Sequence, residues 1–272
     1  MEGFDEYDVL GRRVLVGSRV PEARTTLQQL LRGFGPSPAA TGDWPRYELV
    51  RREDVWFVHT DQGPVHSDRD LIGALGMLEW HVMTGALERH HHLFHLHGAT
   101  LAVPGGGGAV ALVGNSGSGK STLTLALMQR GFLPFADDVA LIDPVTLDVQ
   151  SLRRAFHVSD PSLRLVESFT GKPVSSGGDA PPGFFHPPEW ARAPEPVRWL
   201  LLLELRPDQT PSLTRLTPAD AAVAVLEQSL NLKQASRVGL AAAARLASQT
   251  ECYRFQHGGW PESLAIVEGL AR

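Results

Sequence analysis

The sequence contains a single cysteine, Cys252, so it has no internal disulfide and suits a reducing cytoplasmic compartment. Cys252 stands in an alternating stretch typical of a strand, which favours a small buried side chain over a nucleophile. No run of about 18 apolar residues is present to span a membrane. The acidic N-terminus lacks the basic-then-apolar order of a signal peptide. We therefore expect a cytoplasmic protein without a membrane partner.

An excess of basic residues is also missing. The chain has 25 Lys and Arg against 30 Asp and Glu, a net charge of −5, which gives no electrostatic reason to expect a nucleic-acid partner. We find no internal repeat. A length of 272 residues allows a small domain beside a larger one. We expect a small α+β N-terminal domain over 1–95 and a catalytic α/β domain over 96–272 with a helical C-terminal part. Whether the chain forms a homo-oligomer stays open.

The N-terminal region shows both strand and helix signals. We expect a short strand at 14–16, a helix that begins at Pro21, and a strand at 54–59. Either Asp68 or Asp70 is placed to cap a long helix after it.

Two apolar stretches at 99–103 and 109–113 are separated by only five residues, Pro104 and four glycines. A parallel crossover needs about a dozen residues, so these strands must form an antiparallel hairpin. The stretch at 132–135 reads as the next strand. We expect it to lie beside the strand at 109–113.

A glycine-rich loop follows the hairpin and opens a helix from Ser121 to Arg130. It matches the phosphate-loop pattern G-x-x-x-x-G-K-[ST] and has an apolar strand before it. Its glycines let backbone N–H groups converge on phosphate at a helix N-terminus. We therefore expect ATP and Mg²⁺ here, with Lys120 facing solvent when no nucleotide is bound, and with Ser121 as a metal ligand. The expected nucleotide-binding residues are Gly114, Asn115, Ser116, Gly117, Ser118, Gly119, Lys120, Ser121 and Thr122.

Asp137 and Asp138 follow the strand after this helix. Two adjacent carboxylates near the phosphates can share the work, one serving Mg²⁺ and one accepting the proton of an attacking hydroxyl. The sequence does not say which aspartate does which. The simpler alternative is that the pair only starts a turn.

Taken in order, His97-Gly98, the hairpin, the glycine-rich loop, Arg130-Gly131 and Ala136-Asp137-Asp138 resemble the catalytic core of the HPr kinase/phosphorylase family and its HPr-kinase-related serine kinases. The resemblance implies a P-loop kinase core of the HPr-kinase/PEP-carboxykinase-like type. It implies catalytic roles for Asp137, Asp138, His97 and Lys120, and metal binding by Ser121 with Asp137 or Asp138. The matched elements cover about a fifth of the chain.

The chain departs from that family after the Asp-Asp strand, where a glycine-rich Arg-Gly signature is missing. The resemblance therefore does not extend to HPr as acceptor or to phosphorolysis. The layout is closer to the HPr-kinase-like proteins of lasso-peptide and other peptide-modification clusters, which implies transfer of the γ-phosphoryl group to Ser or Thr of a peptide or protein. A nucleotide-gated P-loop ATPase or switch, and a kinase of a small-molecule hydroxyl, remain open alternatives.

The segment 170–196 is rich in proline and glycine, so we expect a long loop. A lid over the site is one interpretation, with three aromatic residues gripping the acceptor and basic residues binding acidic groups. A plain linker with solvated surface residues is the other. The residues concerned are Phe184, Phe185, Trp190, Arg153, Arg154 and Lys172. Glu204 resembles the acidic residue of a motor ATPase only weakly. The histidines at 90–92 and 95 show no closed zinc ligand set.

Overall fold

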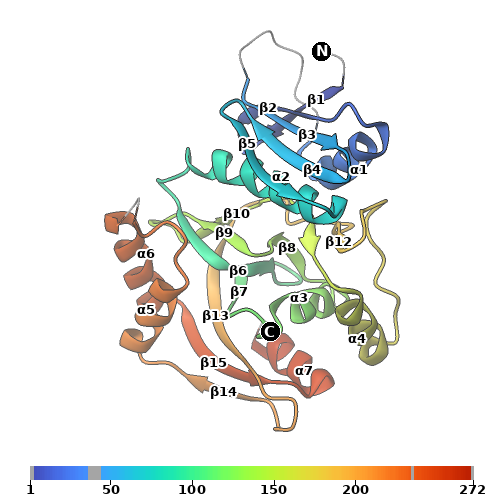
Figure 1. Cartoon of the computed structure of the whole chain (residues 1–272). Helices are drawn as coiled ribbons and strands as arrows, with labels where there is room; N and C mark the ends of the chain where they lie inside the picture. The colour runs from blue at the N-terminus through green and yellow to red at the C-terminus, as the bar shows by residue number, and fades with distance from the viewer. Residues whose placement is uncertain (1–2, 36–43, 234–235, 271–272) are drawn as a thin grey trace. The chain divides into compact units, whose positions relative to one another are not determined.

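The computed structural model describes residues 3–35, 44–233 and 236–270. The fold is mixed α/β with several sheets (Figure 1). It divides into two compact units. The first comprises Met1–His90 with Ser176–His186, and the second comprises His91–Ser175 with Pro187–Arg272. Among the helices of the described ranges, none has the length and apolar character needed to cross a bilayer.

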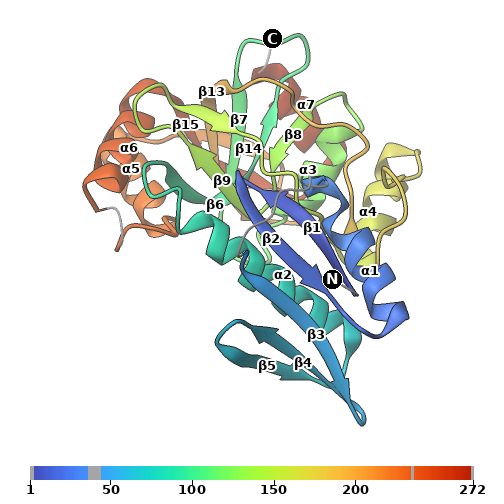
Figure 2. The ribbon, with the colours of Figure 1, turned by 90° about the horizontal axis from the view of Figure 1, so that it is seen from above.

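The first unit is a five-stranded sheet with two helices. Its strands run in the order β1 to β5, with only β2 and β3 parallel (Figure 2). The helix predicted at Pro21 is confirmed, and so is the cap at Asp70, whose carboxylate accepts from the Gly73 N–H at 3.0 Å. The elements are β1 Phe4–Val9, β2 Arg12–Gly17, α1 Pro21–Leu31, η1 Arg32–Phe34, β3 Arg46–Arg52, β4 Val55–Thr60, β5 Gly63–Asp68, α2 Leu71–Leu87 and β12 Phe184–Phe185.

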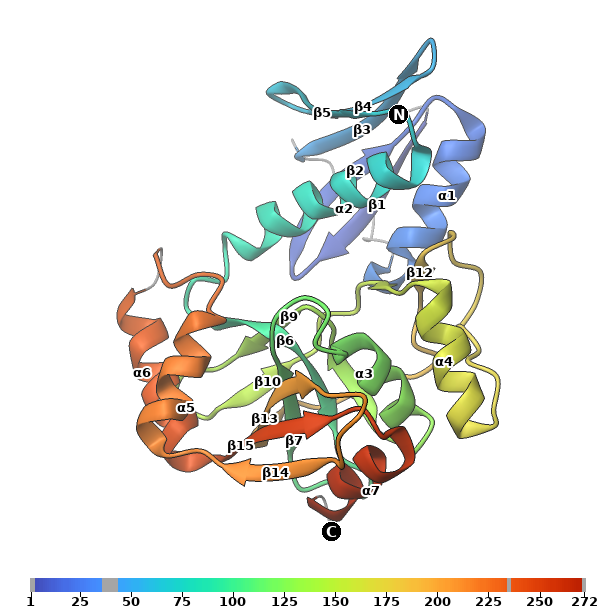
Figure 3. The ribbon, with the colours of Figure 1, turned by 60° about the horizontal axis from the view of Figure 1, so that its bottom comes forward.

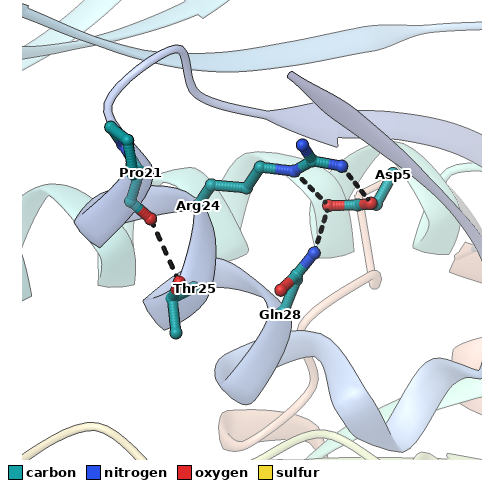
Figure 4. A network of polar contacts seen from close by, with 5 residues as sticks. All are labelled: Asp5, Pro21, Arg24, Thr25 and Gln28. Atoms are coloured by element: carbon teal, nitrogen blue, oxygen red, sulfur yellow. Dashed lines mark hydrogen bonds and ion pairs between the residues drawn. The ribbon is translucent and has the colours of Figure 1, made fainter. Parts of the chain in front are cut away.

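A polar network ties α1 to β1. The Arg24 guanidinium donates to both carboxylate oxygens of Asp5, at 3.0 and 2.8 Å, and the Gln28 amide donates to the same carboxylate at 2.9 Å (Figure 4). The Arg24 contact holds the pKa of Asp5 below its ordinary value. The negative charge of Asp5 is thus paired with the positive charge of Arg24, and both carboxylate oxygens accept hydrogen bonds.

The second unit is an eight-stranded sheet covered by helices. Its order is β10-β9-β6-β7-β13-β15-β14, with β8 on β6. The elements are β6 Phe94–Ala102, β7 Ala109–Val113, α3 Lys120–Met128, β8 Leu133–Ala136, β9 Val139–Ile142, β10 Asp148–Gln150, β11 Phe156–His157, α4 Asp160–Thr170, β13 Glu195–Leu205, β14 Ser212–Arg215, α5 Pro218–Glu227, α6 Ser236–Gln249, β15 Glu251–His257 and α7 Trp260–Leu270.

The predicted hairpin is confirmed, because β6 and β7 pair antiparallel from Gly98 opposite Val113 to Ala102 opposite Ala109. The expected position of the following strand is wrong. β8 pairs with β6 and not with β7, whose other side is taken by β13 in parallel register. The physical reason is that β7 has only two edges. The short glycine loop commits one edge to β6, and the long apolar strand β13 fills the other.

Helices cover both faces of this sheet. Figures 1 and 3 agree in placing α5 and α6 on one face and α3, α4 and α7 on the other. Phe94, Phe135 and Leu200 are fully buried in the core between these layers. Cys252 on β15 is also buried, at 3% exposure, as its sequence context predicted. The candidate site is lined by residues at or just after the ends of β7, β13 and β15.

Candidate phosphate-binding cleft

The glycine-rich loop, Gly114–Ser121, joins β7 directly to α3. Gly119 precedes the first helical residue and has φ of +86°, a conformation that side-chain-bearing residues rarely adopt. A Cβ atom at Gly119 would also lie 2.7 Å from Cε1 of His257. The loop therefore needs glycine here both for its backbone shape and for its close approach to His257. The result is a helix N-terminus that opens toward solvent beside the loop.

Lys120 is buried, with 7% exposure, so the expectation that it faces solvent is wrong. Its ammonium group donates to the carbonyl oxygens of Gly114 at 2.6 Å and Asn115 at 3.3 Å. The physical reason is that a desolvated ammonium needs acceptors, and the loop's own carbonyls provide them. Burial lowers the pKa of Lys120, while the charges of Asp138 and Asp137 act in the opposite direction.

A cleft of about 370 Å³ opens over this loop, a size within the usual range for small-ligand sites. It brings Lys120, Ser121, His97 and Asp138 together, as the sequence predicted for a phosphate site. The lining residues are His97, Ser116–Thr122, Asp138, Ser162, Leu165, Leu205 and Trp260. On the other side of the loop a second hollow of about 390 Å³ is lined by Gly114–Ser118, Leu202–Arg206, Glu227 and Gln228.

Asp138 reaches the cleft because of an unusual backbone turn between β8 and β9. Its φ is +64°, in the left-handed region, and the Val139 N–H donates across the turn to the Asp137 carbonyl at 2.8 Å. The Gly98 N–H donates to the Asp138 carbonyl at 3.1 Å. Aspartate tolerates this conformation better than most residues, and such strain is concentrated at functional sites. The turn thus positions the Asp138 side chain among the cleft-lining groups.

Asp137 is only 2% exposed and is not among the residues that line the cleft. Neither of its carboxylate oxygens has a hydrogen-bond partner of good geometry among the described residues. Burial raises the pKa of Asp137, to about 7, and the charge of Asp138 acts in the same direction, against the charges of Arg154 and Lys120 and a contact with the backbone N–H of Asp138. A buried carboxylate with so little hydrogen bonding is rare in folded proteins. The two aspartates therefore have different environments, which the sequence did not reveal.

His97 lines the cleft and is half-buried. Burial lowers the pKa of His97, helped by the charge of Lys120 and opposed by Asp138 and by a side-chain hydrogen bond with Gln228. The Gln228 amide also donates to Oδ1 of Asn115 in the loop, at 3.2 Å. Gln228 thus connects the histidine to the loop, although no motif in the sequence marks it.

His257, at the end of β15, contacts the glycine-rich loop. The sequence analysis did not identify it as a site residue. Its Nε2 bonds the Ser118 carbonyl at 2.7 Å, and its Nδ1 has no partner in the part of the chain that the structure describes. Burial lowers the pKa of His257, so the neutral ring donates through Nε2. The only sequence signal was a histidine at a strand end, and the β15 pairing that brings it to the loop is a long-range contact.

Several other candidates do not line the cleft. Lys172 and Arg153 are exposed elsewhere, whereas Arg154 is 7% exposed and its charge acts on Asp137. Glu204 lines the second hollow and pairs with Arg254 at 3.4 Å and Arg206 at 3.8 Å.

Of the three aromatic residues of the proline-rich loop, two are buried and the third is partly exposed. Phe184 and Phe185 are buried, at 8% and 3% exposure. Trp190 packs edge-on against Phe156, with ring centroids 5.8 Å apart. The loop does contain little regular structure, as predicted, apart from β12.

The first unit has a larger hollow, of about 910 Å³, lined in part by Arg19, Arg24 and Arg46. Two of these arginines are paired within the unit, because Arg24 binds Asp5 at 2.8 Å and Arg19 lies 3.8 Å from Glu48. The described residues that line the hollow include neither a glycine-rich loop nor a buried unpaired carboxylate.

The residues present fit a divalent cation. Ser121 supplies a hydroxyl and Asp138 a carboxylate to the same cleft, and Asp137 supplies two buried oxygens without a partner. Such hard oxygen donors suit Mg²⁺, which keeps several waters and takes few protein ligands. No cluster of three or more His, Cys, Asp or Glu side chains that could hold a metal was found in the described ranges. The fit is therefore to a cation shared with a ligand such as a phosphate, and not to a closed protein cage.

Comparisons with protein-family models and with curated protein sequences found no match to this chain. The functional interpretation therefore depends on the residues of the cleft and their arrangement.

Proposed function

We propose that this chain is an ATP-dependent kinase with a P-loop core of the HPr-kinase/PEP-carboxykinase-like type. It transfers the γ-phosphoryl group to a hydroxyl of Ser or Thr in a peptide or protein. The observation that carries the proposal is that Lys120, Ser121, His97 and Asp138 line one cleft at the N-terminus of α3. The resemblance to HPr-kinase-related serine kinases, including those of peptide-modification clusters, supports the same reading.

The loop and α3 bind the nucleotide phosphates in this proposal. Free backbone N–H groups and the positive end of the helix favour the anion. Lys120 exchanges its two bonds to the loop carbonyls for bonds to phosphate oxygens, so its burial keeps the ammonium close to the position where it is needed. Thr122, which follows Ser121 at the start of α3, adds a hydroxyl to the same cleft.

The chemical step needs a base and charge stabilisation. The oxygen of the acceptor hydroxyl attacks the γ-phosphorus, and Asp138 accepts the proton of that hydroxyl. The bond between the γ-phosphorus and the bridging oxygen breaks, which releases ADP. Lys120 stabilises the negative charge on the transferred group. Mg²⁺, when bound by Ser121 and the aspartates, neutralises further phosphate charge. Neutral His97 orients Asp138 or the acceptor from the same wall of the cleft.

The different exposures favour Asp138 as the group that meets the acceptor, because only Asp138 lines the cleft. Asp137 is buried under it and is better placed to act on the metal, or on Asp138 through its charge. This division is part of the proposal.

One observation favours a second candidate, a nucleotide-gated ATPase or switch. Gln228 bonds both His97 and the loop residue Asn115. Glutamine beside a phosphate loop can position an attacking water in such proteins. In that case ATP turnover would need no acceptor.

The test is phosphoryl transfer from γ-labelled ATP, with Mg²⁺, to a library of Ser- and Thr-containing peptides and to small hydroxyl compounds. We expect label in a peptide, and none with Asp138→Asn. The control is Asp54→Asn, which changes a carboxylate that is 98% exposed in the first unit. ATP hydrolysis that is independent of every acceptor and lost with Gln228→Ala would favour the switch. Absence of any ATP binding would overturn both candidates.

A further inference from the structure

Three large apolar residues line the same cleft as Asp138, and together we call them its apolar wall. Leu165 on α4 and Leu205 at the end of β13 are among the exposed large apolar residues, at 39% and 37% exposure. Trp260, the first residue of α7, completes the wall. Large apolar side chains exposed together inside a polar cleft indicate a site for an apolar or aromatic group.

Trp260 is held in place by its neighbours. Its ring is stacked on Phe169 with centroids 5.2 Å apart and an angle of 4°, and it meets His257 edge-on at 5.3 Å. Its outer ring atom lies 3.5 Å from where a Cβ on Gly119 would stand. The indole is thus fixed at the glycine-rich loop and loses little freedom when a ligand packs against the wall.

The order of strands in the sheet separates Trp260 from Asp138. Gly98 on β6 bonds the Asp138 carbonyl, and β6 is followed in the sheet by β7, β13 and β15. The loop leaves β7, Leu205 ends β13, and His257 ends β15 just before Trp260. Neighbouring strands lie about 4.8 Å apart, so β6 and β15 are separated by about 14 Å. A phosphate chain over the loop therefore has the carboxylate at one end and the apolar wall at the other.

We propose that Leu165, Leu205 and Trp260 form the subsite for the planar heteroaromatic base of the nucleotide. This rests on the proposed function, in which the loop binds the phosphates and Asp138 faces the γ-phosphoryl group. The acceptor hydroxyl must then approach at the His97 and Asp138 end. The wall on the far side of the loop is left for the base, which binds by stacking and apolar contact.

The test separates the base from the phosphates by comparing two ligands in calorimetry with Mg²⁺, a non-hydrolysable ATP analogue and inorganic tripolyphosphate. The variants are Trp260→Leu and Leu165→Gln, both neutral, so that electrostatic attraction to phosphate is unchanged. Leu240→Gln is the matched control, because Leu240 is 54% exposed on α6, on the opposite face of the sheet. Melting curves of all variants show whether they are folded.

Trp260→Leu and Leu165→Gln are each expected to bind the ATP analogue at least about tenfold more weakly than wild type. This loss of affinity corresponds to about 1.4 kcal/mol of stacking. Tripolyphosphate affinity is expected to stay within about twofold of wild type, as is the affinity of Leu240→Gln for both ligands. Unchanged analogue binding, or equal weakening of both ligands, would overturn the base subsite while leaving the phosphate site intact. A wild-type protein that binds neither ligand would overturn the proposed function as well.

Discussion

The two units differ in how completely their polar side chains are hydrogen-bonded. In the first unit the Asp5 carboxylate receives three hydrogen bonds from Arg24 and Gln28 (Figure 4). Its one unpaired buried atom in the described residues, Nε2 of His66, lies 3.9 Å from the Asp68 carboxylate.

In the second unit the described residues have more unpaired buried side-chain atoms, and half of these belong to Ser118 in the glycine-rich loop, to His257, which bonds the loop, and to Asp137. The others are in Thr100, Thr124, Ser229 and Glu268. Lys120 bonds the carbonyls of Gly114 and Asn115 in its own loop. Unpaired buried polar groups cost stability, so those of Ser118, Asp137 and His257 favour a role in ligand binding over a role in stability. The comparison predicts that changes near the loop affect function more than folding, and that changes in the Asp5 network do the opposite.

The largest effect is expected for Lys120→Ala, or for Lys120→Met, which keeps more of the buried volume. Either should lower phosphoryl transfer by at least about 10²-fold, because a charge that stabilises the transferred group is lost. The melting temperature should change little, since the variant also removes a desolvated ammonium. Lys172→Ala, at an exposed lysine outside the cleft, is the control. Normal transfer by the Lys120 variants would remove the loop from the mechanism.

Substitutions of the two aspartates are expected to have similar effects on turnover but different effects on the melting temperature. Asp138→Asn should lower turnover by at least about 10²-fold, with the backbone preserved because asparagine also tolerates the left-handed conformation. Asp137→Asn should lower turnover similarly but raise the melting temperature at pH 8 in chelator.

The reason is that the raised pKa of Asp137 means that its buried charge is unfavourable in the folded state, and the amide removes that charge. Turnover assays and melting curves on both variants check this. If Asp137→Asn melts lower and turns over normally, Asp137 is a structural partner of Arg154.

A smaller effect is expected at His257. His257→Ala should weaken nucleotide binding by about tenfold, because the loop loses the hydrogen bond to Ser118. His257→Gln keeps a donor and should bind nearly as wild type. Equal loss in both variants would mean that the ring fills space and does not position the loop.

Wild type and His257→Gln can also be compared at different pH values. Burial lowers the pKa of His257 in the folded state. As the pH falls through about 6.5, this histidine becomes protonated in the unfolded chain, whereas it stays neutral in the folded chain until a lower pH. The stability that depends on neutral His257 is present at higher pH and is lost as pH falls below that value. The melting temperature of wild type should therefore drop more between pH 7.5 and 5.5 than that of His257→Gln. Parallel curves would contradict this.

The smallest functional effect is expected for Asp5→Asn in the first unit. Transfer should be unchanged, and the melting temperature should fall by about 1–3 °C at neutral pH, because the pair with Arg24 is partly exposed. The pKa of Asp5 is lowered, so this stabilisation is present above about pH 4 and is lost in acid. A loss of transfer without unfolding would mean that the two units are functionally coupled.

Local signals predicted much of the second unit. The five-residue connection at 104–108 required the hairpin, and the glycine-rich loop predicted the strand before it and the helix after it. The expected helical C-terminal part is also present, as α5, α6 and α7. In the first unit the helix at Pro21 and the Asp70 cap were predicted, whereas β1, β3 and β5 were not, because charged and polar residues interrupt their alternation.

What the sequence alone determined is the set of groups that depend on local spacing: the loop at Gly114–Ser121, the helix that it opens, and an acidic pair one strand later. Tertiary structure decided how these groups are used. The pairing of β8 with β6, the turn at Asp138, the burial of Asp137 and Lys120, and the arrival of Gln228, His257 and Trp260 at the loop all depend on strand order. Strand order and the burial of these polar side chains are set by contacts between residues far apart in the chain, and local periodicity, which marks only apolar faces, does not reveal them.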